Sequence, residues 1–185
     1  LTIRHVTLDA SSGYGLEASA RAARYAAYAE CDGDCLLLAQ HRGDQAETVL
    51  FNLLRGTGVT GAAGMPVERR FGSLRLMRPM LDVSRAEIEG YALAEGLTWI
   101  TDESNADTTL TRNFLRHEAL TAISQRFPAA EASLALAASH FAEAAGLLDE
   151  FAEQDWRLVC EGDAARMRTL RELSLPRLKN LLRHR

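Results

Sequence analysis

The sequence lacks long apolar runs and paired cysteines, and each absence excludes a class of protein. No uncharged apolar run approaches the roughly 20 residues that a membrane span needs, and residues 1–10 lack the regions of a secretion signal. We therefore expect a cytoplasmic protein that has no membrane partner. Its three cysteines cannot all pair, and Cys31 and Cys35 lack the second close pair of a zinc knuckle. We interpret all three as buried or incidental thiols.

Positive charge is not in excess either. The net charge of −4 argues against a uniformly basic surface that coats nucleic acid. Charge is uneven along the chain, however, because residues 128–155 hold six acids and no lysine or arginine, whereas residues 166–185 hold seven basic residues. Residues 69–85 add five arginines. These arginines can contact phosphates, and a solvated surface is the alternative for any one of them.

Length and composition fit an ordinary folded protein of one domain, or one domain plus part of another. We place a boundary near Pro128, where an alanine-rich segment that predicts one long helix, residues 129–159, begins. Residues 1–127 then form the first domain. Residues 128–185 form a linker helix and the start of a helical domain, whose last segment, residues 170–182, is amphipathic.

The first domain has the pattern of an α/β sheet. Residues 1–8 alternate as a strand does, residues 16–29 favour a helix, and residues 35–39 form a short apolar run typical of a strand buried on both faces. Strand, helix and strand imply a parallel crossover. Further along we expect a flexible glycine loop from Gly56 to Gly64 and then a strand at 74–78, which Pro79 ends. A helix at 84–95 should follow, with Ser84 and Glu87 as its capping box. After it we expect an extended segment at 97–100 and a helix that begins near Arg112.

Polar residues gather directly after the apolar run. His41, Asp44 and Glu47 lie at the start of a segment whose apolar residues have helical spacing. Taken singly, Asp44 as N-cap with Glu47 three residues on is a variant of the capping box, and His41 is a structural histidine. Taken together at the carboxyl end of a strand, where α/β sheets bind ligands, they can bind an ammonium group or coordinate magnesium.

A second polar stretch, residues 101–111, precedes the helix near Arg112. It carries Asp102, Ser104, Asn105 and Asp107. Loops dense in such residues often carry function, and the same residues are common in turns and caps.

Residues 38–48, LAQHRGDQAET, resemble the motif A-x-H-x-x-D-Q-x-E-T of the tRNA(Ile)-lysidine synthetases, members of the PP-loop ATP pyrophosphatase group. The resemblance spans about residues 15–120. Its other parts are Ala20-Arg21 with Arg24-Tyr25, Arg55 to Gly58 with Gly61, Gly64 and Met65, Arg78-Pro79 with Ser84-Arg85 and Glu87-Ile88, and Trp99, Asp102, Ser104, Asn105 and Asp107 followed by Arg112-Asn113 and Arg116.

Two departures from the family pattern stand out. The Ser-Gly-Gly-x-Asp-Ser phosphate loop, whose backbone amides hold nucleotide phosphates, does not occur in the sequence. We therefore expect the chain to begin partway through the sheet and, by itself, to be inactive. Gly43 also stands where the family often has an aspartate, which leaves Asp44 as the carboxylate to rely on.

The resemblance implies a partial doubly wound parallel sheet of the PP-loop, adenine nucleotide alpha hydrolase type, followed by a helical region. It also implies a ligase that uses ATP and Mg²⁺ to adenylate the wobble cytidine of an isoleucine tRNA, after which free L-lysine displaces AMP to form lysidine. Asp44 and Glu47 would supply an acidic pocket and a base, His41 would orient groups or transfer a proton, and Arg112 with Asn113 would stabilise the nucleotide phosphates.

The metal ligands stay unidentified in this interpretation, and a homodimer is compatible with it. The alternatives are another PP-loop enzyme that modifies tRNA or forms amides, and a non-catalytic RNA-binding fragment.

Overall fold

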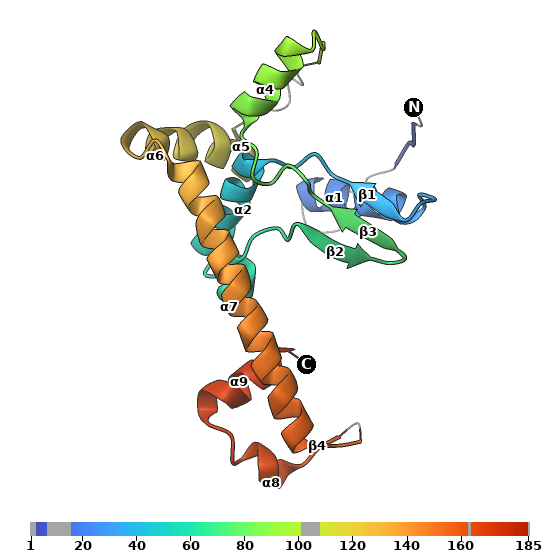
Figure 1. The fold of residues 1–185 in the computed structure, drawn as a ribbon, viewed down its shortest axis with the longest axis vertical. Helices are drawn as coiled ribbons and strands as arrows, with labels where there is room; N and C mark the ends of the chain where they lie inside the picture. The colour runs from blue at the N-terminus through green and yellow to red at the C-terminus, as the bar shows by residue number, and fades with distance from the viewer. Residues whose placement is uncertain (1–2, 7–15, 101–107, 163, 185) are drawn as a thin grey trace. The chain divides into compact units, whose positions relative to one another are not determined.

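The computed structural model of the protein describes residues 3–6, 16–100, 108–162 and 164–184, apart from the side chains of residues 16–18 (Figure 1). The chain divides into two compact units. The first comprises residues 1–40 and 66–81, and the second comprises residues 41–65 and 82–185. No helix among the described residues is long and apolar enough to cross a membrane.

The first unit is a small mixed sheet with one helix. Strand β3 (Leu74–Met77) lies in the middle, parallel to β1 (Cys35–Leu37) and antiparallel to β2 (Glu68–Phe71). Helix α1 (Leu16–Ala29) contacts the sheet through aromatic side chains. Leu74 and Leu76 of β3 are buried and form the core of this unit.

The sequence predicted part of this unit correctly. Helix α1 and strand β3 lie where they were expected. The parallel pair that is present joins β1 and β3, and it is not the expected pair of residues 1–8 with residues 35–39. The strand expected at residues 1–8 is wrong for residues 3–6, which have no strand structure. The antiparallel strand β2 was not predicted, because its sequence ERRF is mostly charged.

Strand β1 is not buried on both faces as its apolar run suggested. It pairs with β3 along one edge, and Leu37 is 66% exposed. Cys31 and Cys35 beside it are also exposed, and all three cysteines are free, so of the two expected alternatives, buried or incidental thiols, burial is wrong for these two.

The second unit is mainly helical, and its long helix α7 (Ala130–Val159) organises it (Figure 1). Helix α7 packs against α2 (Arg42–Leu54) and α3 (Val59–Ala62), and farther along against α9 (Leu175–His184). The remaining elements are α4 (Arg85–Ala94), α5 (Thr111–Phe114), the π-helical segment η2 (Leu115–Ala119), α6 (Leu120–Arg126), the strand pair β4 (Cys160–Glu161) and β5 (Ala164–Ala165), and α8 (Met167–Leu170).

Apolar contacts hold α7 at both ends. Ala46 and Val49 of α2 and Ala138 of α7 are fully or almost fully buried, and small side chains let helices approach closely. Near the other end, Val159 of α7 and Leu181 of α9 belong to one buried cluster. The predicted long helix is confirmed, and Gly146 does not interrupt it.

The glycine-rich segment after α2 is more ordered than predicted. It contains helix α3, and the Asn52 side chain donates to the Gly61 carbonyl at 2.7 Å. Gln45 of α2 donates to the Met65 carbonyl at 3.0 Å and accepts from the Met65 amide at 2.8 Å. These bonds fasten the segment to α2, and part of the expected loop is the helix α3.

Candidate functional site

The site begins at the N-terminus of α2, where His41 is the capping residue. The Gly43 amide donates to His41 Nδ1 at 3.0 Å, and the His41 amide donates to Asp44 Oδ2 at 3.0 Å. A neutral imidazole that accepts at Nδ1 carries its proton on Nε2, which lies 3.6 Å from Asp44 Oδ2. A capping box is therefore present, but its members are His41 and Asp44, so the expected pair of Asp44 and Glu47 is wrong by three residues.

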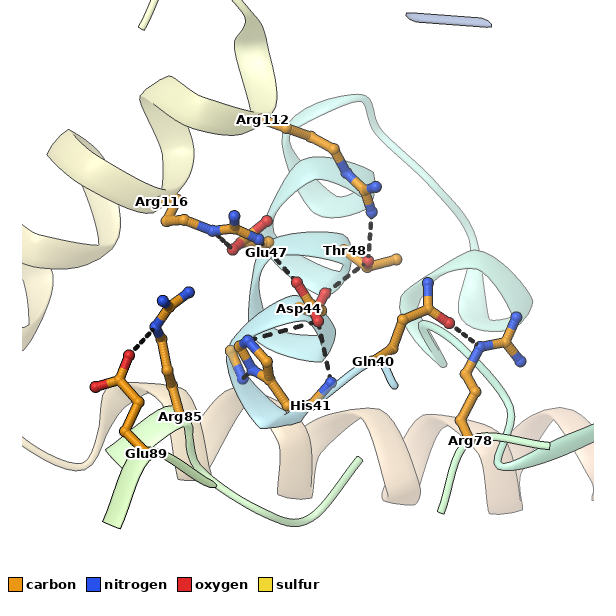
Figure 2. A network of polar contacts seen from close by, with 11 residues as sticks. Gln40, His41, Asp44, Glu47, Thr48, Arg78, Arg85, Glu89, Arg112 and Arg116 are labelled. Carbon is orange, nitrogen blue, oxygen red and sulfur yellow. Dashed lines mark hydrogen bonds and ion pairs between the residues drawn. The ribbon is translucent and has the colours of Figure 1, made fainter. Parts of the chain in front are cut away.

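One arginine joins the two carboxylates of α2. Arg116 donates from Nη2 to Asp44 Oδ1 at 2.8 Å and from Nε to Glu47 Oε1 at 2.5 Å (Figure 2). Asp44 and Glu47 lie on one side of α2 because they are three residues apart on a helix. Asp44 thus has one oxygen fixed by the helix cap and the other by Arg116.

Glu47 is the most buried charged group of the site, with only 3% of its surface exposed. Burial raises the pKa of Glu47, and the nearby Asp44 carboxylate adds to the increase, whereas Arg116 and Arg112 oppose it. Burial lowers the pKa of Arg116, but Glu47 and Asp44 outweigh it and raise that pKa overall, so Arg116 stays charged. The site is therefore a partly buried cluster of two carboxylates with Arg116 bound to both and Arg112 close by.

Arg112 reaches the next turn of α2. Its Nη2 donates to Thr48 Oγ1 at 3.1 Å, and the Thr48 hydroxyl donates to the Asp44 carbonyl at 2.8 Å. Asn113, beside it on α5, is half-buried. A guanidinium has several N–H donors, so one bond to a hydroxyl leaves donors for a phosphate.

The structure brings His41, Asp44, Glu47 and Arg112 together, as Figure 2 shows, although their chemical roles stay predictions. Arg116 was quoted as part of a motif but was not chosen as a site residue. It lies in the π-helical segment η2, a wider turn of a kind often found at functional sites. One sequence signal could have identified it. Two carboxylates on one turn of a helix repel each other, so a basic residue is expected close to them.

Two expected contributions to the site are not seen. Residues 101–107, which carry Asp102, Ser104, Asn105 and Asp107, lie outside the described residues. Across the part of the chain that is described, no group of three or more His, Cys, Asp or Glu side chains is placed to hold a metal ion.

Comparisons with known proteins agree with the resemblance found in the sequence. The family model described as the PP-loop domain matches residues 1–123. The tRNA(Ile)-lysidine synthase of Pseudomonas putida is 45% identical over all of this chain and 45% of its own length. The proteins of the same name from Nitrosomonas europaea and Pseudomonas syringae pv. tomato are 43% and 52% identical, over 100% and 81% of this chain and 41% and 34% of their own lengths. The chain thus spans less than half the length of these relatives.

Proposed function

This chain belongs to the PP-loop domain family, and from that premise we propose that the protein forms lysidine on an isoleucine tRNA. ATP adenylates the 2-carbonyl oxygen of the wobble cytidine and releases pyrophosphate, and the side-chain amine of free lysine then displaces AMP. The curated relatives, which match most of this chain, are named for this product, and this supports the proposal. A tRNA substrate implies the cytoplasm as the location.

The observation that carries the proposal is the bridging of Asp44 and Glu47 by the Arg116 guanidinium. Two carboxylates that bind one nitrogen cation have the charge and the acceptor geometry to bind a lysine ammonium. Glu47 suits the role of base, because burial raises its pKa and so increases its affinity for a proton. Asp44, more exposed and fixed by the helix cap, suits the role of holding the amine.

His41 and Arg112 act beside this pair. His41 orients Asp44 through the capping box, and its Nε2 lies 3.6 Å from Asp44 Oδ2. Arg112, with Asn113 beside it, stabilises the negative charge that develops on the α-phosphate and the leaving pyrophosphate.

Magnesium accompanies ATP in the proposed reaction, but the described residues do not form a site for it. Mg²⁺ usually binds through one or two carboxylates together with the substrate phosphates, and among the described residues no group of three or more His, Cys, Asp or Glu side chains is placed to hold it. No step is therefore derived through this ion. ATP supplies the adenylyl group that activates the cytidine.

The domain division proposed from the sequence also bears on function. The family match ends at residue 123 and α7 begins at Ala130, which supports a PP-loop part in residues 1–127 and a helical part in residues 128–185. We assign the arginines of residues 166–185 to the tRNA body. A sizing measurement on the full-length protein decides whether it is a homodimer.

The test is ATP-dependent incorporation of labelled lysine into an isoleucine tRNA transcript with a wobble cytidine. The natural full-length protein should incorporate lysine, and this 185-residue chain serves for comparison. ATP consumption by the full-length protein without lysine transfer would favour another PP-loop activity. RNA binding without ATP consumption would favour a non-catalytic role.

Two amide variants test the residue roles within that assay. Asp44→Asn and Glu47→Gln should each lower kcat/KM for lysine at least tenfold, about 1.4 kcal/mol, while adenylation of the tRNA continues. Glu87→Gln is the matched control, because Glu87 has the same position in the capping box of α4 that Asp44 has in α2. Normal lysine transfer by Asp44→Asn would remove the central assignment.

A further inference from the structure

A second cluster of cations lies in the first unit, around Tyr25 of α1. The guanidinium carbon of Arg21 is 5.1 Å from the centre of the Tyr25 ring, and that of Arg69 is 5.3 Å from it. The Phe71 ring meets Tyr25 edge to face, with 5.3 Å between ring centres. Two exposed arginines therefore lie close to one aromatic side chain, which a second aromatic ring contacts edge to face.

A third arginine lies behind this pair and is almost fully buried. Arg78, 3% exposed, donates from Nη1 to the Pro66 carbonyl at 2.8 Å and from Nε to the side chain of Gln40 (Figure 2). Gln40 follows β1 and Arg78 follows β3. Because these strands are parallel, both side chains lie at the carboxyl edge of the sheet, where α/β proteins bind ligands.

The three arginines act electrostatically on one another and on Tyr25. Burial lowers the pKa of Arg78, and the charges of Arg69 and Arg21 lower it further against the opposing effect of Tyr25. Burial raises the pKa of Tyr25, but the charges of Arg21, Arg69 and Arg78 outweigh it and lower that pKa overall. The cluster therefore has a positive potential.

The described residues supply no carboxylate within ion-pair distance of Arg21, Arg69 or Arg78. The opposite face of the same hairpin differs, because Arg75 pairs there with Glu68 at 2.8 Å. Side chains alternate between the faces of a strand, so Arg69 and Phe71 share one face and Glu68 and Arg70 share the other. Cations that are grouped and have no acidic partner among the described side chains, one of them buried, favour an anion as a binding partner.

We propose that Arg21 and Arg69 beside Tyr25, together with the neighbouring Arg78, bind a phosphate group. Guanidinium groups match phosphate oxygens in geometry and charge, and an adjacent aromatic ring keeps their planes oriented. The site lies in the first unit and is distinct from the cluster of Asp44, Glu47 and Arg116. The phosphate belongs either to a nucleotide or to the backbone of an RNA, and the two sources can be separated by experiment.

The experiment compares two double variants of the natural full-length protein. Arg21→Gln with Arg69→Gln removes the two exposed cations of the cluster. Arg24→Gln with Arg70→Gln removes the same charge from the same helix and strand, at exposed positions that do not act on Tyr25. Binding of an isoleucine tRNA transcript is measured without ATP over a range of salt concentrations, and binding of ATP is measured without tRNA.

The cluster variant should bind one ligand at least tenfold more weakly than the control variant does. Weaker tRNA binding identifies the RNA backbone as the source of the phosphate. The logarithm of the binding constant should then depend less steeply on the logarithm of the salt concentration, by about one to two phosphate contacts. Loss of ATP binding identifies a nucleotide, and loss of both indicates a phosphate site that both use. Equal binding of both ligands by the two double variants would overturn the proposal. Because these assays measure binding, they can succeed even if lysine incorporation fails.

A titration of the Tyr25 phenol checks the site in a protein whose arginines are unchanged. Inorganic phosphate bound beside Tyr25 offsets the guanidinium charges, so it should raise the pKa of this phenol. The absorbance of tyrosinate is followed against pH with and without phosphate, and the Tyr25→Phe variant identifies the signal of Tyr25. A Tyr25 signal that phosphate does not move, at concentrations that saturate binding, contradicts a site at this position.

Discussion

Replacing Arg116 with methionine should destabilise the protein by an amount that depends on pH. Methionine keeps an unbranched side chain but removes the charge, so the buried Glu47 loses the cation that stabilises its ionised form. Breaking a buried ion pair from one side costs about 3–5 kcal/mol when the remaining group stays charged. Glu47 avoids part of that cost by taking up a proton, which sets a ceiling on the loss.

The ceiling follows from the free energy of protonating a carboxylate. One pKa unit corresponds to about 1.36 kcal/mol, and an ordinary glutamate has a pKa of about 4.3, so protonating Glu47 costs about 3.7 kcal/mol at pH 7 and about 1 kcal/mol at pH 5. Because burial already raises the pKa of Glu47, the measured losses should lie below these values. A folded-state pKa above the unfolded one means that the loss grows as pH rises.

The assay is urea unfolding followed by circular dichroism at pH 5 and pH 7. Arg85→Met is the control, because Arg85 pairs with Glu89 at 2.7 Å on the exposed surface of α4 (Figure 2). Such exposed pairs contribute about 0–1 kcal/mol. Equal losses for the two variants, or a loss for Arg116→Met that is the same at both pH values, would refute the electrostatic argument.

Two further predictions concern backbone and charge. Gly64→Ala should lower the midpoint of thermal unfolding, because the φ of Gly64 is +66° and the added carbon would lie 2.8 Å from Gln45 Oε1. Gly146→Ala inside α7 should instead stabilise the protein by about 0.5–1 kcal/mol, because alanine favours a helix more than glycine does. A lower midpoint for both variants would contradict this contrast. Hydrogen bonds that the His184 ring donates to the carboxylates of Glu153 and Asp149 raise the pKa of His184. Its contribution to stability is therefore complete below the ordinary value of about 6.5 and is lost as pH rises through the folded value. His184→Asn should therefore flatten the stability curve between pH 5 and pH 8, and an unchanged curve would exclude this role.

Local patterns predicted the helices well, because a helix is specified by residues close together in the chain. Ser84 and Glu87 predicted the capping box of α4, and alanine spacing predicted α7. Strand β2 was missed because hydrogen bonding to β3 overrides the low strand propensity of its charged residues. The exposure of Leu37 was missed because burial depends on which neighbours a strand has in the sheet.

The candidate site shows the same limit. Spacing grouped His41, Asp44 and Glu47, because all three lie within two turns of one helix. The contacts of Arg116 with Asp44 and Glu47 join residues 72 and 69 positions apart in the chain, which no local pattern contains. Arg116 also lies in a π-helical segment, a wider turn that local sequence patterns did not predict.

Helix capping and the proposed chemistry use the same atoms, so the two interpretations of Asp44 are complementary. The His41 amide fixes Asp44 Oδ2, and the Gly43 amide fixes the imidazole of His41. A carboxylate held in this way keeps Oδ1 directed at the cation without losing side-chain entropy when a ligand binds. Glu47, one turn farther along α2, has no capping role, and its position is set by burial and by Arg116. The cap therefore fixes the position of Asp44, whereas the buried Glu47 needs a nearby cation to stabilise its ionised form.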